Sequence, residues 1–192
     1  IEEADGILLI GTNPRKEAPI LNARIRKRFV AGGVKIGVIG DGADLTYDYD
    51  HISDTADAVA KIADGSHPFA QVLKDAERPM LVLGMGALTR ADSDAILGAG
   101  YAIAESTGMV SGDWNGFNVL HTAAARVGAL DVGFVPGEGG KDTQGILDGA
   151  ASGDIQAVYL LGADEIDTAK LTDAFVIYQG HHGDAGAHVA DV

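Results

Sequence analysis

Residues 4–27 have the sequence ADGILLIGTNPRKEAPILNARIRK, and this stretch decides the fold. Gly6–Ile10 is a short apolar run that predicts a strand buried on both faces, as in a parallel sheet. A turn over Gly11–Pro14 follows at once, and apolar residues at helical spacing then predict a helix over Ala18–Phe29. A buried strand that turns directly into a helix is the start of a βαβ unit.

Further apolar runs repeat this arrangement along the chain. They lie at Val34–Ile39, Met80–Leu83, Ala157–Leu161 and Phe175–Tyr178. Patterns typical of helices lie between or beside them, at 55–63, 68–76, 92–106, 119–127 and 144–151, and a short strand is predicted at 132–135. We therefore expect an α/β fold, with a mostly parallel sheet flanked by helices in the Rossmann-like manner. Since no linker or repeat divides the sequence, residues 1–192 are expected to form a single α/β unit.

The composition limits the classes of protein to which the chain can belong. It has 28 Asp and Glu residues against 14 Lys and Arg, a net charge of −14. This balance argues against nucleic acid as a partner, because phosphate binding requires a basic surface. No apolar run approaches the ~20 residues of a membrane helix, so no direct membrane insertion is expected. The absence of cysteine excludes thiolate zinc sites and thiolate-held iron–sulfur clusters within these residues.

Half of the positive charges lie in one segment. Residues 15–35 contain seven of the 14 cations: Arg15, Lys16, Arg24, Arg26, Lys27, Arg28 and Lys35. Two functional interpretations are open, a docking surface for an acidic partner and a cradle for an anionic cofactor above the first strand. A solvated helix face without a ligand is the third interpretation.

Three strand ends carry small or polar residues at the place where a parallel sheet binds ligands. They are Gly11–Pro14, Gly84–Gly86 and Gly162–Glu165. Backbone N–H groups and helix N-termini at such ends can hold phosphate. However, no Gly-Lys-Ser/Thr follows any of them, and Gly84–Gly86 lacks the third glycine of the dinucleotide fingerprint. Nucleotide-type binding and plain turns between strand and helix therefore both stay open.

A cluster of histidines follows the last predicted strand. It consists of His181, His182, Asp184 and His188. Imidazole and carboxylate groups are ligands for zinc and similar cations, so the cluster is a possible metal site. Gly183 and Gly186 make the segment flexible, and adjacent histidines usually point apart, so we expect no metal there. No residues form a recognisable catalytic set, and none is assigned a catalytic role.

Several stretches together resemble one family. They are ADGILLIGTNPRKEAPILNARIRK (4–27), LVLGMGAL (81–88), AVYLLGADE (157–165) and FVIYQGHHGDAGAHVADV (175–192). These stretches are similar to the molybdopterin-oxidoreductase-like region of the large iron–sulfur subunit of bacterial respiratory NADH:quinone oxidoreductase, complex I. The first stretch is the most specific, because its strand, GTNPR turn and NARIRK helix match the family in order and spacing. The resemblance covers the whole chain, as a fragment of the parent subunit.

The resemblance implies a molybdopterin-oxidoreductase or formate-dehydrogenase-like domain. In molybdopterin enzymes, loops like those at 11–14 and 84–86 help to hold a pterin–guanine dinucleotide. The complex I subunit is understood to carry no molybdenum cofactor, and its iron–sulfur clusters lie in a region that this chain lacks. We therefore expect no cofactor in these residues, and vestigial cofactor positions without a ligand at Gly11, Thr12, Asn13, Gly84 and Gly86.

The resemblance also implies a role and a place in the cell. The intact subunit would take part in electron transfer from NADH to quinone, beside other subunits of the peripheral arm, on the cytoplasmic side of the bacterial inner membrane. The chain itself would be a scaffold without its own active site. The alternative is a fragment of a working molybdopterin-dependent, formate-dehydrogenase-like oxidoreductase that binds the pterin dinucleotide. A stand-alone nucleotide-binding protein is a third hypothesis, disfavoured because Ile1 and Val192 resemble cuts within a longer chain.

Overall fold

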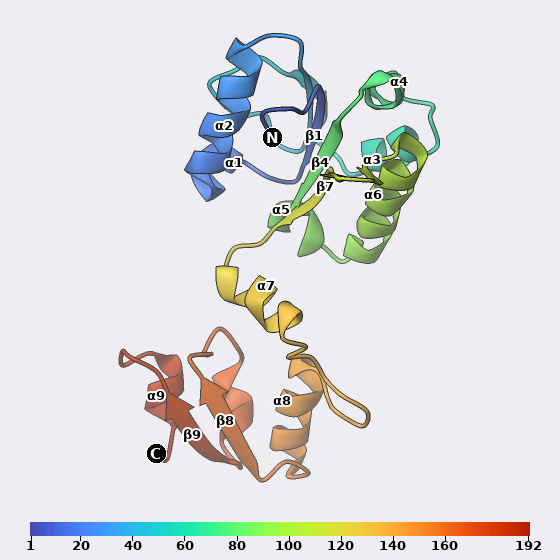
Figure 1. Cartoon of the computed structure of the whole chain (residues 1–192). Coiled ribbons are helices and arrows are strands. Elements are labelled where there is room, and N and C mark those ends of the chain that lie inside the picture. The colour runs from blue at the N-terminus through green and yellow to red at the C-terminus, as the bar shows by residue number, and fades with distance from the viewer. The chain divides into compact units, whose positions relative to one another are not determined.

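The apolar run Gly6–Ile10 is strand β1, and it lies at the centre of a five-stranded parallel sheet (Figure 1). The computed structural model describes residues 1–192, except for the side chain of residue 124. The other strands of this sheet are β2 Lys35–Ile39, β3 Asp50–Ser53, β4 Pro79–Gly84 and β7 Phe117–Leu120. Their order is β3-β2-β1-β4-β7, and every neighbouring pair is parallel. The predicted α/β fold with a mostly parallel sheet flanked by helices is confirmed.

Helices cover both faces of this sheet. They are α1 Pro14–Glu17, α2 Pro19–Val30, α3 Asp57–Ala63, α4 Phe69–Asp75, α5 Met85–Leu88 and α6 Ser93–Thr107. Side chains alternate along a strand, so Leu8 and Ile10 join the core formed with α3, α4 and α6. Ile7 and Leu9 point to the opposite face and join the core formed with α2. Because Ile7–Ile10 are at most 1% exposed, the continuous apolar sequence of β1 is explained by burial on both faces.

The chain divides into two compact units, Ile1–Arg126 and Val127–Val192, called unit 1 and unit 2 below. Unit 1 holds the five-stranded sheet and a small antiparallel hairpin, β5 Val110–Ser111 with β6 Trp114–Asn115. Helix α7, Ala124–Asp131, spans the boundary between the units. The expectation of a single α/β unit over residues 1–192 stays a prediction, and the units are described separately.

Unit 2 has a small core of its own. Its elements are α8 Thr143–Ser152, β8 Ala157–Leu161, the 3-10 helix η1 Thr168–Leu171, β9 Phe175–Gln179 and α9 Ala185–Val189. Strands β8 and β9 pair in parallel as a two-stranded sheet. Leu147 of α8 and Leu171 of η1 pack with Val158 and Val176 on one face of this pair. The predicted strands at 157–161 and 175–178 are therefore confirmed.

The structure differs from the sequence analysis at three places. The helix predicted over 119–127 begins only at Ala124, because Val119 and Leu120 belong to β7 and pair with the end of β4. Residues 132–135, all of them described, form no strand. Asp50–Ser53 is the edge strand β3, which the sequence analysis does not predict. Among the residues that the structure describes, no helix is both long and apolar enough to span a membrane.

Candidate functional site

The loops that follow β1 and β4 meet at one edge of the unit 1 sheet. The chain runs from β1 outward to β2 and β3, and then returns to the other side of β1 with β4. Ile10 at the end of β1 lies beside Leu83 near the end of β4, so the two loops begin at the same level. This change of direction between neighbouring strands is the place where open parallel sheets bind ligands. The structure thus brings two of the three predicted loops together at the edge where such sheets bind ligands.

The glycines of these two loops are packed against each other. A Cβ atom added to Gly84 would lie 2.5 Å from both the carbonyl oxygen of Gly11 and the Cβ of Thr12. A Cβ added to Gly86 would lie 2.6 Å from the same Gly11 oxygen. Gly11 itself has φ +59°, and a Cβ there would collide with the backbone of Ala87. The close approach that requires glycine is therefore between two parts of the protein itself.

Glu17 accepts hydrogen bonds from the loop after β1. The backbone N–H of Asn13 donates to Oε1 of Glu17, and the Thr12 hydroxyl donates to Oε2 at 3.2 Å. The carbonyl of Asn13 in turn accepts from the N–H of Glu17 at 2.9 Å, which closes the first turn of α1. A carboxylate of the same protein therefore holds two of the donors that a phosphate would need.

Three donors of the loop after β1 are used within the protein in the arrangement that the structure shows, which disfavours a phosphate at these positions. Gly11 donates its N–H to the carbonyl of Ile39 at 2.8 Å, and Asn13 and Thr12 donate to Glu17. Among the described side chains, Oδ1 of Asn13 is buried without a hydrogen-bond partner. That atom is an acceptor, so it does not complement a phosphate oxygen. This buried oxygen therefore offers nothing to a phosphate.

The third predicted loop belongs to a different sheet. Gly162, with φ +57°, follows β8 in unit 2, and its N–H donates to the carbonyl of Gln179 at 2.7 Å. All three loops follow an apolar strand, and this shared pattern is why the sequence predicts them together. The sheet topology separates the third from the other two, since β8 pairs only with β9 among the described strands.

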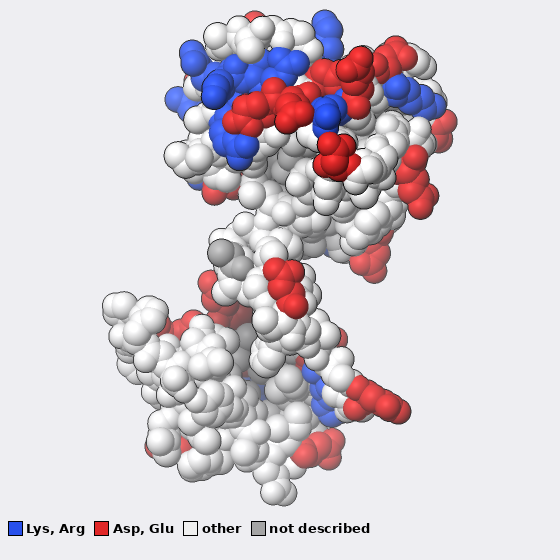
Figure 2. Space-filling model, in the orientation of Figure 1, with Lys and Arg blue, Asp and Glu red and all other residues white. Residues whose placement is uncertain are grey.

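The arginines of the basic segment bind acceptors of unit 1. Arg24 donates to both carboxylate oxygens of Glu2, at 2.8 and 2.6 Å, and Arg28 donates to the carbonyl of Ala4 at 2.6 Å. Arg15 donates to the carbonyl of Asp44 at 2.9 Å. Figure 2 shows the basic side chains gathered in the region of α2 with acidic side chains among them. These contacts tie α1 and α2 to their surroundings, while the docking and cradle interpretations stay predictions.

The histidine cluster is not drawn together around one point. His188 lies in the short helix α9, whereas His181 and His182 precede that helix and contact each other through their Nδ1 atoms. The carboxylate of Asp184 accepts from the Tyr178 hydroxyl at 3.3 Å. Within the described part of the chain, no three His, Cys, Asp or Glu side chains are grouped so that they could hold a metal ion.

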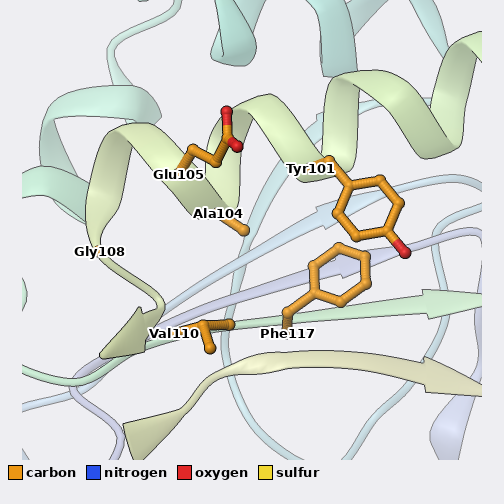
Figure 3. A pocket seen from close by; sticks show the side chains of 6 residues that line it. All are labelled: Tyr101, Ala104, Glu105, Gly108, Val110 and Phe117. Atoms are coloured by element: carbon orange, nitrogen blue, oxygen red, sulfur yellow. The ribbon is translucent and has the colours of Figure 1, made fainter. Parts of the chain in front are cut away.

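Two hollows in unit 1 lie away from the glycine loops. One of about 170 Å³ is lined by Tyr101, Ala104, Glu105, Gly108, Val110 and Phe117 (Figure 3). The rings of Tyr101 and Phe117 stack there with centroids 4.7 Å apart. The other, of about 240 Å³, lies beside the edge strand β3 and includes His51 and His67. Neither lining contains a lysine or arginine, so neither has the positive charge that a dinucleotide would favour.

The sequence pattern predicts the glycines of the site but not Glu17. The signal was present, because an acidic residue in the first turn of a helix often accepts from the N–H groups that begin it. Asn13 and Glu17 stand four residues apart on either side of Pro14, which is typical of a helix start. The hollow at Tyr101 and Phe117 gave no signal, because it depends on how α6 packs beside β7.

Comparisons with known proteins agree over the whole chain. A family model described as molybdopterin oxidoreductase matches residues 1–192. All of this chain aligns with 25% of the NADH dehydrogenase (ubiquinone) iron-sulfur protein 1, mitochondrial, of Solanum tuberosum, at 44% identity over 193 residues. It also aligns with 27% of an NADH-quinone oxidoreductase subunit of Rickettsia bellii, at 42% identity. A third relative is the NADH-ubiquinone oxidoreductase 75 kDa subunit of Reclinomonas americana, at 40% identity over 27% of its length.

The chain spans about a quarter of the length of the curated relatives that it matches. The predicted resemblance to the large iron–sulfur subunit of NADH:quinone oxidoreductase is confirmed by these identities. Since the family model covers every residue, and the parallel sheet with helices on both faces is the predicted architecture, the chain belongs to the molybdopterin oxidoreductase family.

Proposed function

We propose that this chain is a non-catalytic scaffold region of the large iron–sulfur subunit of NADH:quinone oxidoreductase. The observation that carries the proposal is 40–44% identity, over the whole chain, to proteins that bear the names of this subunit. The intact subunit takes part in the transfer of electrons from NADH to quinone. Its iron–sulfur clusters are held outside these 192 residues, since the sequence contains no cysteine to ligate them.

The cofactor positions are vestigial in this proposal. The contact between the two loops accounts for glycine at positions 11, 84 and 86 without a ligand. The hydrogen bonds to Glu17 give Thr12 and Asn13 a structural role in the same way. A phosphate would gain little from the Gly11 and Asn13 N–H groups and the Thr12 hydroxyl, because binding to them would first break the hydrogen bonds that they already donate within the protein. This arrangement favours a scaffold over a working molybdopterin enzyme.

The partners in this proposal are other subunits of the peripheral arm, on the cytoplasmic side of the bacterial inner membrane. The names of the relatives support a place within that complex. The net charge of −14 disfavours nucleic acid as a partner. Direct insertion into the membrane is not part of the role.

Titration calorimetry with guanosine diphosphate tests the scaffold role against the alternative, a dinucleotide-binding oxidoreductase. The probe carries the guanine nucleotide half of the pterin dinucleotide, and the intact parent subunit is assayed in parallel for bound molybdenum. We expect no binding heat at millimolar nucleotide and no molybdenum above background. Micromolar affinity, or molybdenum near one atom per polypeptide, would overturn the scaffold role in favour of the molybdopterin enzyme.

A further inference from the structure

One face of the two-stranded sheet in unit 2 is exposed and apolar. Successive side chains of a strand point to opposite faces, so Val158 and Leu160 enter the core while their neighbours point the other way. The large apolar side chains on the exposed face are Tyr159, Leu161 and Phe175, which are 54%, 63% and 49% exposed. Ala157 and Ile177 share this face with them by the same alternation.

This exposure is unusual for parallel strands. Parallel sheets occur almost only with both faces covered, and both faces of the unit 1 sheet are indeed covered by helices. In unit 2, α8 and η1 contribute Leu147 and Leu171 to the core on the covered face. The same face also receives α9, since Gly186 lies against the ring of Tyr178. Thus all three described helical elements that join this core lie on one side.

The exposed face carries no charged side chain that would favour its exposure to water. Neither β8 (AVYLL) nor β9 (FVIYQ) contains a charged residue. Its polar groups, the Tyr159 hydroxyl and the Gln179 side chain, hydrogen-bond each other. Figure 2 shows a broad surface free of charged side chains over the region of β8 and β9. A surface of this kind marks an interaction site.

The outer edge of β9 is already paired. The N–H of Tyr178 donates to the carbonyl of Val192 at 2.8 Å, and the N–H of Asp191 donates to the carbonyl of Val176 at 2.8 Å. A further strand would pair at an edge of the β8–β9 sheet and would leave its apolar face exposed. In α/β folds, the element that covers a sheet face is a helix.

We propose that the face formed by Tyr159, Leu161 and Phe175 is the docking surface of an amphipathic helix from the part of the parent subunit outside residues 1–192. The relatives are about four times as long as this chain, so such a parent has ample sequence to supply it. The helix presents an uncharged apolar stripe, because the face that receives it carries no charge. The inference rests on the proposed function in one respect: it requires that the chain is part of a parent subunit of that length.

Hydroxyl-radical footprinting of the intact parent subunit and of the 192-residue chain tests the proposal. Tyr159 and Phe175 are expected to oxidise about tenfold more slowly in the parent, because a docked helix removes most of their exposed surface. Phe134 is 78% exposed in the same unit and lies outside any strand, so it serves as the internal control. Its rate is expected to be the same in both proteins.

Matched variants of the parent identify what gives the protection. Leu161→Asp places a charge in the docking surface and is expected to return Tyr159 and Phe175 to the rates of the short chain. Phe134→Asp is expected to leave their protection intact. Equal rates for Tyr159 in the two wild-type proteins would overturn the proposal, because the face would then be bare in the parent.

Two further outcomes would identify a different occupant. Protection that appears in the short chain as its concentration rises, with dimers in sedimentation, would make a second copy the occupant and overturn the proposal. Protection found only in the assembled complex would make another subunit the occupant, and this outcome would also overturn the proposal. A failure of the scaffold role is seen separately, as bound molybdenum or nucleotide, and does not change these rates.

Discussion

A single methyl group added to Gly84 is predicted to force apart the two loops at the edge of the sheet. Its Cβ would lie 2.5 Å from backbone and side-chain atoms of the loop after β1, and backbone there cannot move cheaply. Gly84→Ala is expected to lower the free energy of unfolding by roughly 1–3 kcal/mol, the usual cost of overpacking. Urea unfolding followed by circular dichroism measures the change.

Gly98 provides the matched control for that substitution. It lies within α6, and an added Cβ would meet nothing within 4 Å. Gly98→Ala is therefore expected to raise stability by roughly 0.5–1 kcal/mol, because alanine loses less backbone entropy in a helix. Similar effects of the two substitutions would contradict the close contact between the loops.

Tyr47 satisfies a buried amide, and its loss is predicted to be costly. Its hydroxyl donates to Oδ1 of Asn22 at 2.9 Å, while Nδ2 of Asn22 donates to the carbonyl of Leu45 at 3.0 Å. Burial raises the pKa of the Tyr47 phenol, so the group stays a neutral donor near neutral pH. Tyr47→Phe leaves the amide oxygen buried without a donor, which is expected to cost about 1–3 kcal/mol in unfolding free energy.

Tyr49→Phe is the comparison for this prediction. The Tyr49 hydroxyl instead hydrogen-bonds the backbone of Ala43, and that site is half-buried, so water can replace the lost partner. Its denaturation midpoint should therefore fall less than that of Tyr47→Phe. The reverse order in urea unfolding would show that burial of Asn22 does not determine the cost.

At the scale of elements, helix α2 is tied to the N-terminal segment by a pH-dependent contact. The hydrogen bonds from Arg24 lower the pKa of Glu2 from 4.5 to about 2. Because the folded pKa lies below the unfolded one, the stabilisation is complete above about pH 5 and is lost as the pH falls toward 2. The effect is small, since both side chains are solvent-exposed.

The Glu2→Gln variant isolates this contribution. The wild-type protein is expected to be more stable than Glu2→Gln at pH 6, and the difference should shrink toward zero near pH 2. Urea midpoints of both proteins at matched pH values measure it. A stability difference that does not change between pH 6 and pH 2 would show that the contact does not depend on the Glu2 charge.

In unit 1, the strands that the sequence predicted, β1, β2 and β4, are those buried on both faces. The continuous apolar run of β1 is stable only where both faces of the strand are buried, so the sequence alone predicts a central strand there. Strand β3 (DHIS) is a polar edge strand, and its pairing with β2 depends on tertiary packing that leaves no periodic pattern. The short apolar run at Val119 suits either a helix or a strand, and contact with β4 decides between them.

The candidate site was predictable in position but not in geometry. Glycine at the ends of apolar strands marked Gly11 and Gly84, because a positive φ favours glycine at Gly11 and the close approach of the opposing loop requires it at Gly84. That the two loops touch follows from the strand order, which places β4 beside β1. The acceptor role of Glu17 follows from the turn at Asn13, whose conformation a sequence pattern does not specify.

At the scale of the molecule, unit 1 is predicted to fold without unit 2. Both of its cores are built from residues between Ile1 and Leu120, and all five strands of its sheet lie within the same range. A polypeptide of residues 1–126 is expected to unfold cooperatively and to give a dispersed amide NMR spectrum. A shorter one, 1–113, lacks β7 and is expected to lose cooperativity, since β4 becomes an edge strand.

A collapsed amide spectrum for residues 1–126 would contradict this independence. Circular dichroism at several temperatures separates the outcomes, because a cooperative transition needs an intact core. The comparison also gives a reference stability for unit 1, against which the effects of Gly84→Ala and Tyr47→Phe can be placed.

The contact between Gly11 and the Gly84–Gly86 loop also limits how this protein can drift in sequence. A lineage that no longer uses a ligand at this edge would still be held to glycine there, because the opposing loop excludes any larger residue. Glycine at a strand end indicates that another group approaches the backbone closely, but it does not indicate whether that group belongs to a ligand or to the protein itself. Glu17, which accepts hydrogen bonds from Thr12 and Asn13, is the more informative residue. A survey of relatives for an acidic residue at this position would distinguish loops whose donors are used within the protein from loops whose donors are free to bind a phosphate.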